Sequence, residues 1–252
     1  MGDERELLGK RFVELARRAE NGGYFTFTDF LGLREQSIFD GIRTRLGRTK
    51  YVAFGGAEGA ERVMIRFGNE EELGYAQPFP IRCLRIRPKA ERFAEKLSHR
   101  DFLGALMSLG IEREVLGDIV IRDSVGYLFL REDMLDFVAG SLSEIRRTTV
   151  VCEEVCELPE GELYRTEERR IQLASERLDA VIAKTFNLSR EDAQALFARG
   201  LVFASGREIS SPSYTPKVGE KVSVRGHGRL IYRGVDGLSR KGKLNVTILL
   251  YV

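Results

Sequence analysis

Residues 175–229 constrain the fold more than any other part of this chain. The segment reads SERLDAVIAKTFNLSREDAQALFARGLVFASGREISSPSYTPKVGEKVSVRGHGR. Apolar residues recur every three or four positions in its first half, which predicts two short amphipathic helices. Ser189 is suited to cap the second helix and Gly200 to end it. We expect these helices to bury Leu178, Val181, Ile182 and Phe186 from the first, and Ala193, Leu196 and Phe197 from the second.

Charge is distributed unevenly along the 252 residues, although the net charge is only +2. Residues 171–252 contain 13 Lys and Arg against 7 Asp and Glu, whereas residues 1–170 contain 27 against 31. A basic end on an acidic body is typical of proteins that bind a polyanion through one domain.

The basic end contains candidate phosphate-binding side chains. Arg190 falls in the first turn of the second helix, where a cation opposes the helix dipole at a cost of a few tenths of a kcal/mol. Because a helix N-terminus also offers free N–H groups to anions, this position favours a phosphate contact. Arg177 and Lys184 are seven residues apart and share a helix face. Other cations can extend the basic surface: Arg199, Arg207, Lys217, Lys221, Arg225 and Arg229.

Gly226 and Gly228 flank His227. Two interpretations remain open for this triplet: a close approach of the backbone to a sugar-phosphate chain, or an ordinary hairpin turn.

The spacing of these residues resembles that of S4-type RNA-binding modules. Arg-Leu-Asp is followed ten residues later by Ser-Arg, then by A-x-x-L-F-x-x-G-x-V-x-x-x-G and a Val-Gly-Glu turn. Two turn positions depart from the pattern. Ser205 stands where Asn or Asp is usual, and Glu220 stands where Asp is usual. We expect Asp179 to pair with a nearby arginine. By position, the resemblance implies RNA-binding roles for Arg177, Asp179, Ser189 and Arg190, with Arg225 and Arg229 following.

The rest of the chain predicts an α+β protein of three small domains. Residues 1–75 read as an N-terminal α+β domain. Residues 76–160 show the order β-α-β-β-α-β, which is that of ferredoxin-like and RRM-like domains. The polar residues 161–174 fit a linker. Residues 175–252 form the S4-like domain, which ends in a β-hairpin around a basic turn.

Motifs outside the S4-like segment resemble the YlmH family of bacterial S4-domain proteins. They are FGGAEGAERVMIRFG, HRDFLGALMSLGIEREVLGDIVI and SVRGHGRL, and the similarity extends from about Leu7 to Val252. The resemblance implies ribosome-associated quality control, in which the protein binds large ribosomal subunits obstructed by peptidyl-tRNA. Its implied partners are rRNA, tRNA and a separate tailing factor of the NEMF type.

The middle domain offers a weaker RNA-binding hypothesis. Tyr127 and Phe129 share one face of the third strand, where RRM domains stack bases. A structural or protein-contact role is the alternative. Three basic clusters also lie outside the S4 pattern: Arg43/Arg45/Arg48/Lys50, Arg82/Arg85/Arg87/Lys89 and Arg240/Lys241/Lys243. The last is a candidate for phosphate contact, and we expect the other two to be solvated faces.

The sequence predicts a non-enzymatic protein without a metal or cofactor. Three cysteines and two histidines provide too few ligands for a typical zinc site. An S4-bearing pseudouridine synthase is an alternative, since such enzymes use the aspartate of an Arg-Leu-Asp motif as nucleophile, and a protein-binding adaptor is another. No run of about 18 apolar residues is present. We expect a cytoplasmic monomer with no membrane association.

Overall fold

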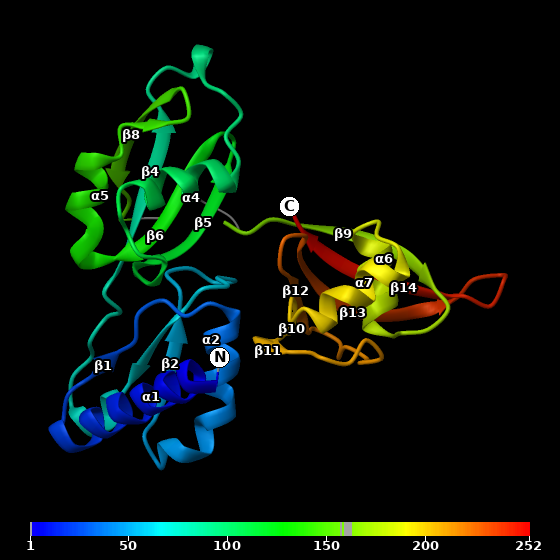
Figure 1. The fold of residues 1–252 in the computed structure, drawn as a ribbon, viewed down its shortest axis with the longest axis horizontal. Coiled ribbons are helices and arrows are strands. Elements are labelled where there is room, and N and C mark those ends of the chain that lie inside the picture. The colour runs from blue at the N-terminus through cyan, green and yellow to red at the C-terminus, as the bar shows by residue number, and fades with distance from the viewer. Residues whose placement is uncertain (1, 157, 159–162) are drawn as a thin grey trace. The chain divides into compact units, whose positions relative to one another are not determined.

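The computed structural model describes residues 2–156, 158 and 163–252, and the chain divides into two compact units, Met1–Leu163 and Tyr164–Val252. Within the described residues the strands form three antiparallel sheets interspersed with helices, so the fold is mixed α+β (Figure 1). The predicted boundary at residues 75 and 76 lies inside the first unit.

The N-terminal part of the first unit packs two helices against a small sheet of order β1-β3-β2. Phe12 of the first helix contacts the edge of Phe39 in the second, with ring centroids 5.3 Å apart. Gly23, with φ of +66°, ends the first helix in a conformation that favours glycine. The elements are α1 Gly2–Gly22, β1 Thr26–Phe27, α2 Leu33–Ile42, η1 Arg43–Leu46, β2 Tyr51–Phe54, β3 Met64–Phe67 and α3 Glu70–Leu73.

The second part of the first unit contains the predicted β-α-β-β-α-β order, with strands arranged β5-β6-β4-β8-β7. Its second helix ends at Ser141, because Glu144–Ile145 pair with the next strand around Arg146, whose φ is +55°. The elements are β4 Ile81–Pro88, η2 Glu91–Phe93, α4 His99–Ser108, η3 Arg113–Val115, β5 Leu116–Arg122, β6 Val125–Arg131, η4 Glu132–Met134, α5 Leu135–Ser141, β7 Glu144–Ile145 and β8 Thr148–Glu154.

The second unit places two helices on one face of a six-stranded sheet of order β11-β10-β12-β13-β14-β9 (Figure 1). The predicted helical stripes form the core with inward-facing residues of the strands, such as Val222, Leu230 and Ile248. The elements are β9 Thr166–Leu173, α6 Leu178–Thr185, α7 Arg190–Ala198, β10 Val202–Ala204, β11 Arg207–Glu208, β12 Lys221–Val224, β13 Gly228–Leu238 and β14 Leu244–Tyr251.

The structure corrects the prediction that residues 161–174 are a linker. Residues 159–162 lie outside the described residues, but Thr166–Leu173 form strand β9, which pairs along its whole length with β14. Only Ile171 and Leu173 of this edge strand are buried, so its charged residues concealed the alternation expected of a strand. The sheet of the second unit therefore includes residues that precede the S4-like segment.

Within the described residues, no helix combines the length and apolarity required to cross a membrane. The same residues contain no cluster of three His, Cys, Asp or Glu side chains arranged to hold a metal ion.

Candidate RNA-binding site

A buried carboxylate organises the helical face of the second unit. Asp179, in the first turn of α6, has no exposed surface. Arg177 donates two hydrogen bonds to its oxygens, from Nε at 3.1 Å and from Nη2 at 2.9 Å. Arg190 approaches from the start of α7 at 3.4 and 3.5 Å, and Gln194 donates at 2.9 Å. One carboxylate therefore holds two guanidinium groups that belong to different helices.

Asp179 remains ionised in this setting. Burial raises its pKa, but the hydrogen bonds from Arg177 and Gln194 and the charge of Arg190 outweigh burial and hold the pKa at about 2. Arg177 and Arg190 keep 39% and 53% of their side-chain surfaces exposed. The anion faces inward, whereas the cations face solvent.

This geometry refines the predicted role of Asp179. Its predicted arginine partner is observed, and its complete burial leaves no surface for direct contact with RNA. Asp179 positions Arg177 and Arg190. Gln194 was missed by the sequence analysis, although it stands four residues after Arg190 and so shares its face of α7.

The start of α7 is capped by side chains. Ser189 Oγ accepts the Asp192 backbone N–H at 3.0 Å and donates to Asp192 Oδ2 at 2.6 Å. Glu191 and Asp192 also place two carboxylates in the first turn. Arg190 therefore needs no bound phosphate to offset its position near the helix dipole, because Asp179 and these carboxylates already do so.

The turn between β12 and β13 packs against the end of α6. The His227 ring lies 6.0 Å from that of Phe186, and His227 N–H donates to the Val224 carbonyl at 3.0 Å. Gly228 has φ of +139°, and a Cβ there would lie 3.2 Å from the Phe186 ring. The triplet therefore lies in the turn of the β12–β13 hairpin, and packing and backbone conformation account for Gly228.

Arg229 lies on the opposite face of the sheet from the helices, because its neighbour Leu230 points into the core. Its guanidinium stands over two aromatic rings, 4.5 Å from the Tyr251 centroid and 5.1 Å from that of Tyr164. Arg225 stands 5.3 Å from the centroid of Phe203. These aromatic partners could not be predicted from the sequence, because no local pattern links Tyr164 or Tyr251 to Arg229.

The predicted site residues therefore do not form one cluster. Lys184, Arg199, Arg207 and Lys217 are exposed at separate places on the second unit. Glu220, in place of the usual aspartate, still caps its turn by accepting the Lys217 N–H at 2.8 Å and the Tyr214 hydroxyl at 3.0 Å. Ser205 adopts φ of +49°, a left-handed conformation that Asn or Asp would adopt more readily.

Comparison with known proteins identifies the family. Residues 76–157 match a family described as "Putative RNA-binding domain in YlmH". The chain is 31% identical over 249 residues to the "Ribosome-associated protein quality control protein P2" of Bacillus subtilis (strain 168), covering 97% of this chain and 94% of the relative. The chain belongs to the YlmH family.

Two other similarities cover less of the chain. A 75-residue stretch is 35% identical to an "Uncharacterized RNA pseudouridine synthase" of Aquifex aeolicus (strain VF5), covering 30% of this chain and 27% of that enzyme. The solved structure of "Cell division protein ylmH from Streptococcus pneumoniae" is 22% identical, with a TM-score of 0.48, and covers 60% of this chain and 91% of that one.

The matched YlmH segment contains the sheet that carries Tyr127 and Phe129, the two candidates for base stacking. Phe129 is only 2% exposed. A Cβ at Gly56, from the loop between β2 and β3, would lie 2.3 Å from the Phe129 ring, so this loop lies directly against it. Phe129 is therefore a packing residue. Tyr127, two positions earlier in β6, remains half-buried.

Proposed function

We propose that this protein is a non-enzymatic factor that binds rRNA or tRNA on the large ribosomal subunit through its second unit. Its role is the rescue of subunits obstructed by peptidyl-tRNA, together with a tailing factor of the NEMF type, as a cytoplasmic monomer. The quality-control name of the Bacillus relative supports this role.

The observation that carries the proposal is the pair of half-exposed arginines fixed by a buried carboxylate. Arg177 and Arg190 present two partly exposed cations, one at the N-cap of α6 and one in the first turn of α7. The second unit adds a general attraction for phosphate, since residues 164–252 contain 16 Lys and Arg against 9 Asp and Glu. Other cations of the second unit add to this attraction from separate places, and His227 lies in the β12–β13 turn; the cations are Lys184, Arg199, Arg207, Lys217, Arg225 and Arg229.

The position of Asp179 argues against the pseudouridine synthase alternative. Asp179 belongs to the only Arg-Leu-Asp of the chain, and its carboxylate is buried and occupied by three side chains. A nucleophile needs access to its substrate, which this carboxylate lacks.

Sedimentation with large subunits tests the proposal. We expect Arg190→Glu to release the full-length protein from large subunits while its circular dichroism spectrum stays unchanged. Because a glutamate beside Asp179 introduces repulsion, Arg190→Gln serves as the milder variant. Arg17→Glu, at an exposed position of α1, makes the same charge change in the first unit as a control. Equal co-migration of all variants with the subunit counts against the proposal.

Salt dependence separates RNA binding from a protein-adaptor role. A complex dominated by phosphate contacts weakens with salt, with a log–log slope of roughly −0.7 to −0.9 per phosphate. A salt-independent interaction with the subunit supports the adaptor instead.

A further inference from the structure

The middle sheet of the first unit buries one face against its helices. Its other face is partly covered by the N-terminal part of the unit and partly uncovered. Leu84, Ile86, Leu128 and Leu130 point toward α4 and α5 and form the core with them. Because side chains alternate along a strand, Tyr127, Phe129 and Arg85 point to the opposite face.

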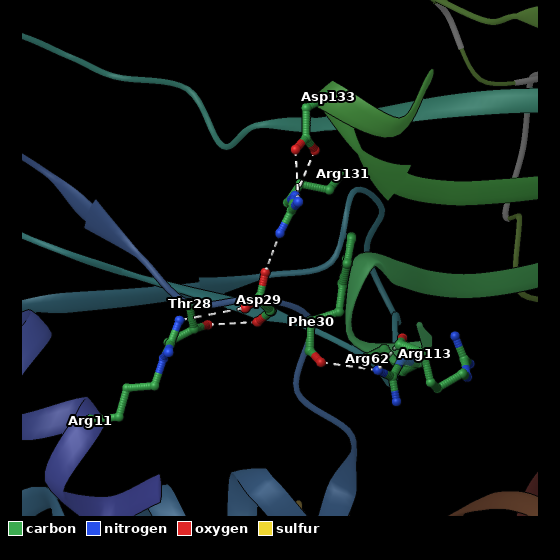
Figure 2. A network of polar contacts seen from close by, with 8 residues as sticks. All are labelled: Arg11, Thr28, Asp29, Phe30, Arg62, Arg113, Arg131 and Asp133. Atoms are coloured by element: carbon green, nitrogen blue, oxygen red, sulfur yellow. Dashed lines mark hydrogen bonds and ion pairs between the residues drawn. The ribbon is translucent and has the colours of Figure 1, made fainter. Parts of the chain in front are cut away.

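The N-terminal part of the same unit occupies half of that opposite face. Phe129 is covered by the loop at Gly56, and Arg131 donates to Asp29 at 2.7 Å (Figure 2). On β5, Asp118 accepts the backbone N–H groups of Glu61 and Arg62 at 2.7 and 3.0 Å. This half is therefore an internal interface.

The other half carries a row of residues across four strands. Tyr127 stands opposite Val120 on one side and Arg85 on the other, and Arg85 in turn stands opposite Glu153. Arg87 and Arg122 lie two residues further along their strands, on the same face. We call Tyr127, Arg85, Arg87 and Arg122 the Tyr127 face.

The Tyr127 face contains more positive than negative charge. Arg85 and Arg87 share the single carboxylate of Glu153, with Arg87 donating at 2.7 Å. Hydrogen bonds from Arg87 and then Arg85 hold the pKa of Glu153 at about 2, so it remains ionised. Nη1 of Arg122 is buried and has no hydrogen-bond partner among the described residues. Three guanidinium groups thus face one carboxylate around a half-buried tyrosine ring.

We infer that the Tyr127 face binds an unpaired RNA nucleotide. The base stacks on Tyr127, and the phosphate is bound by Arg122 and the arginine pair. A base must leave its helix to stack on a sheet, so the ligand is single-stranded or looped RNA. Since Phe129 is covered, one aromatic ring remains on these two positions, and the site holds one base there. The inference rests on the proposed RNA-binding function and adds a second RNA surface in the first unit.

Binding of the full-length protein to a short unstructured RNA oligonucleotide tests this site, with a fully paired, blunt-ended RNA duplex as comparison. We expect Tyr127→Ala to weaken binding of the oligonucleotide roughly fivefold or more, and to leave binding of the duplex unchanged. Tyr127→Phe keeps the ring and is expected to retain affinity. Phe137→Ala is the matched control, because Phe137 is 48% exposed on α5. Unchanged oligonucleotide binding by Tyr127→Ala overturns the inference.

A second variant protects the test against misfolding. Arg122→Gln removes a cation but keeps the Tyr127 ring. We expect it to weaken oligonucleotide binding and to reduce the log–log salt slope by the amount that one phosphate contact contributes. An unchanged slope and affinity also overturn the inference.

Arg190→Gln distinguishes the two proposals. Loss of large-subunit binding in this variant, with no effect of Tyr127→Ala on the oligonucleotide, sustains the proposed function and rejects the Tyr127 face. The reverse result sustains the Tyr127 face alone.

Discussion

Arginine side chains form hydrogen-bond networks in both units, but their acceptors and their exposure differ. In the first unit, the partly buried Arg62 donates to the backbone carbonyls of Leu116, Phe30 and Arg113 at 2.8, 2.9 and 3.0 Å, and Figure 2 shows its contact with Phe30. Burial, followed by the charge of Arg62, lowers the pKa of Arg113 to about 10. In the second unit the carboxylate of Asp179 is buried, and its arginines remain half-exposed. The comparison shows that arginine count alone does not identify a phosphate-binding surface, because some arginines are used entirely by the fold.

Removal of Arg62 should have the largest effect on stability. Arg62→Ala leaves three backbone carbonyls without this donor, which we expect to lower the free energy of unfolding of the first unit by about 3 kcal/mol. RNA binding by the second unit should be unchanged. Hydrogen exchange in the full-length protein across a urea series measures the loss, with Arg17→Ala as control. A loss below about 1 kcal/mol contradicts the structural role.

Asp179→Asn should give the next largest effect. The amide cannot hold both guanidinium groups, and we expect a loss of about 2 kcal/mol in the stability of the second unit, together with weaker subunit binding. The pKa of Asp179 is lowered from 3.8 to about 2, so its stabilising contribution is present above about pH 4 and is lost as the pH falls through 2. Acid unfolding of wild type should therefore be steeper than that of Asp179→Asn over this interval. Identical acid profiles argue against an ionised, paired carboxylate.

Arg177→Gln should separate binding from stability. Arg190 and Gln194 still hold the Asp179 carboxylate in this variant, and glutamine can replace one of the two lost hydrogen bonds, so we expect a cost of about 1 kcal/mol or less in unfolding free energy. Affinity for large subunits should nevertheless fall roughly tenfold, as expected for one charge-assisted hydrogen bond to phosphate. Urea denaturation and sedimentation, run on the same preparation, compare the two quantities. A stability loss that equals the binding loss places Arg177 with the structural arginines.

Lys241 should give the smallest effect. It lies in the exposed turn between β13 and β14, with Arg240 and Lys243. If this turn contacts RNA, Lys241→Gln weakens binding by a few fold and lowers the salt slope by roughly 0.7 to 0.9, with no change in unfolding. Arg48→Gln, at an exposed position after α2 in the first unit, is the control. An equal effect of both substitutions indicates a nonspecific charge effect.

Local periodicity predicted the elements that carry the arginines. Leu178, Val181 and Ile182 recur at helical spacing, and they form the core under α6 as expected. The β-α-β-β-α-β order was also readable, because its strands alternate and its helices are flanked by turn residues.

Tertiary contacts determined what the sequence could not predict. Strand β9 carries two buried residues among charged ones, so its pairing with β14 leaves little local signal. The burial of Phe129 depends on Gly56, which lies more than 70 residues away in the chain. The burial of Asp179 depends on the simultaneous presence of Arg177, Arg190 and Gln194, which no local pattern encodes.

The shared carboxylate has a consequence for how selective the helical face can be. A free arginine side chain loses about 2 kcal/mol of rotamer entropy when a ligand immobilises it. Asp179 restrains Arg177 and Arg190 during folding, before any RNA arrives. The two guanidinium groups are therefore held at a restricted separation from each other. Under the proposed function, phosphates with a matching spacing would bind at reduced entropic cost, and a flexible chain that cannot hold that spacing would gain less.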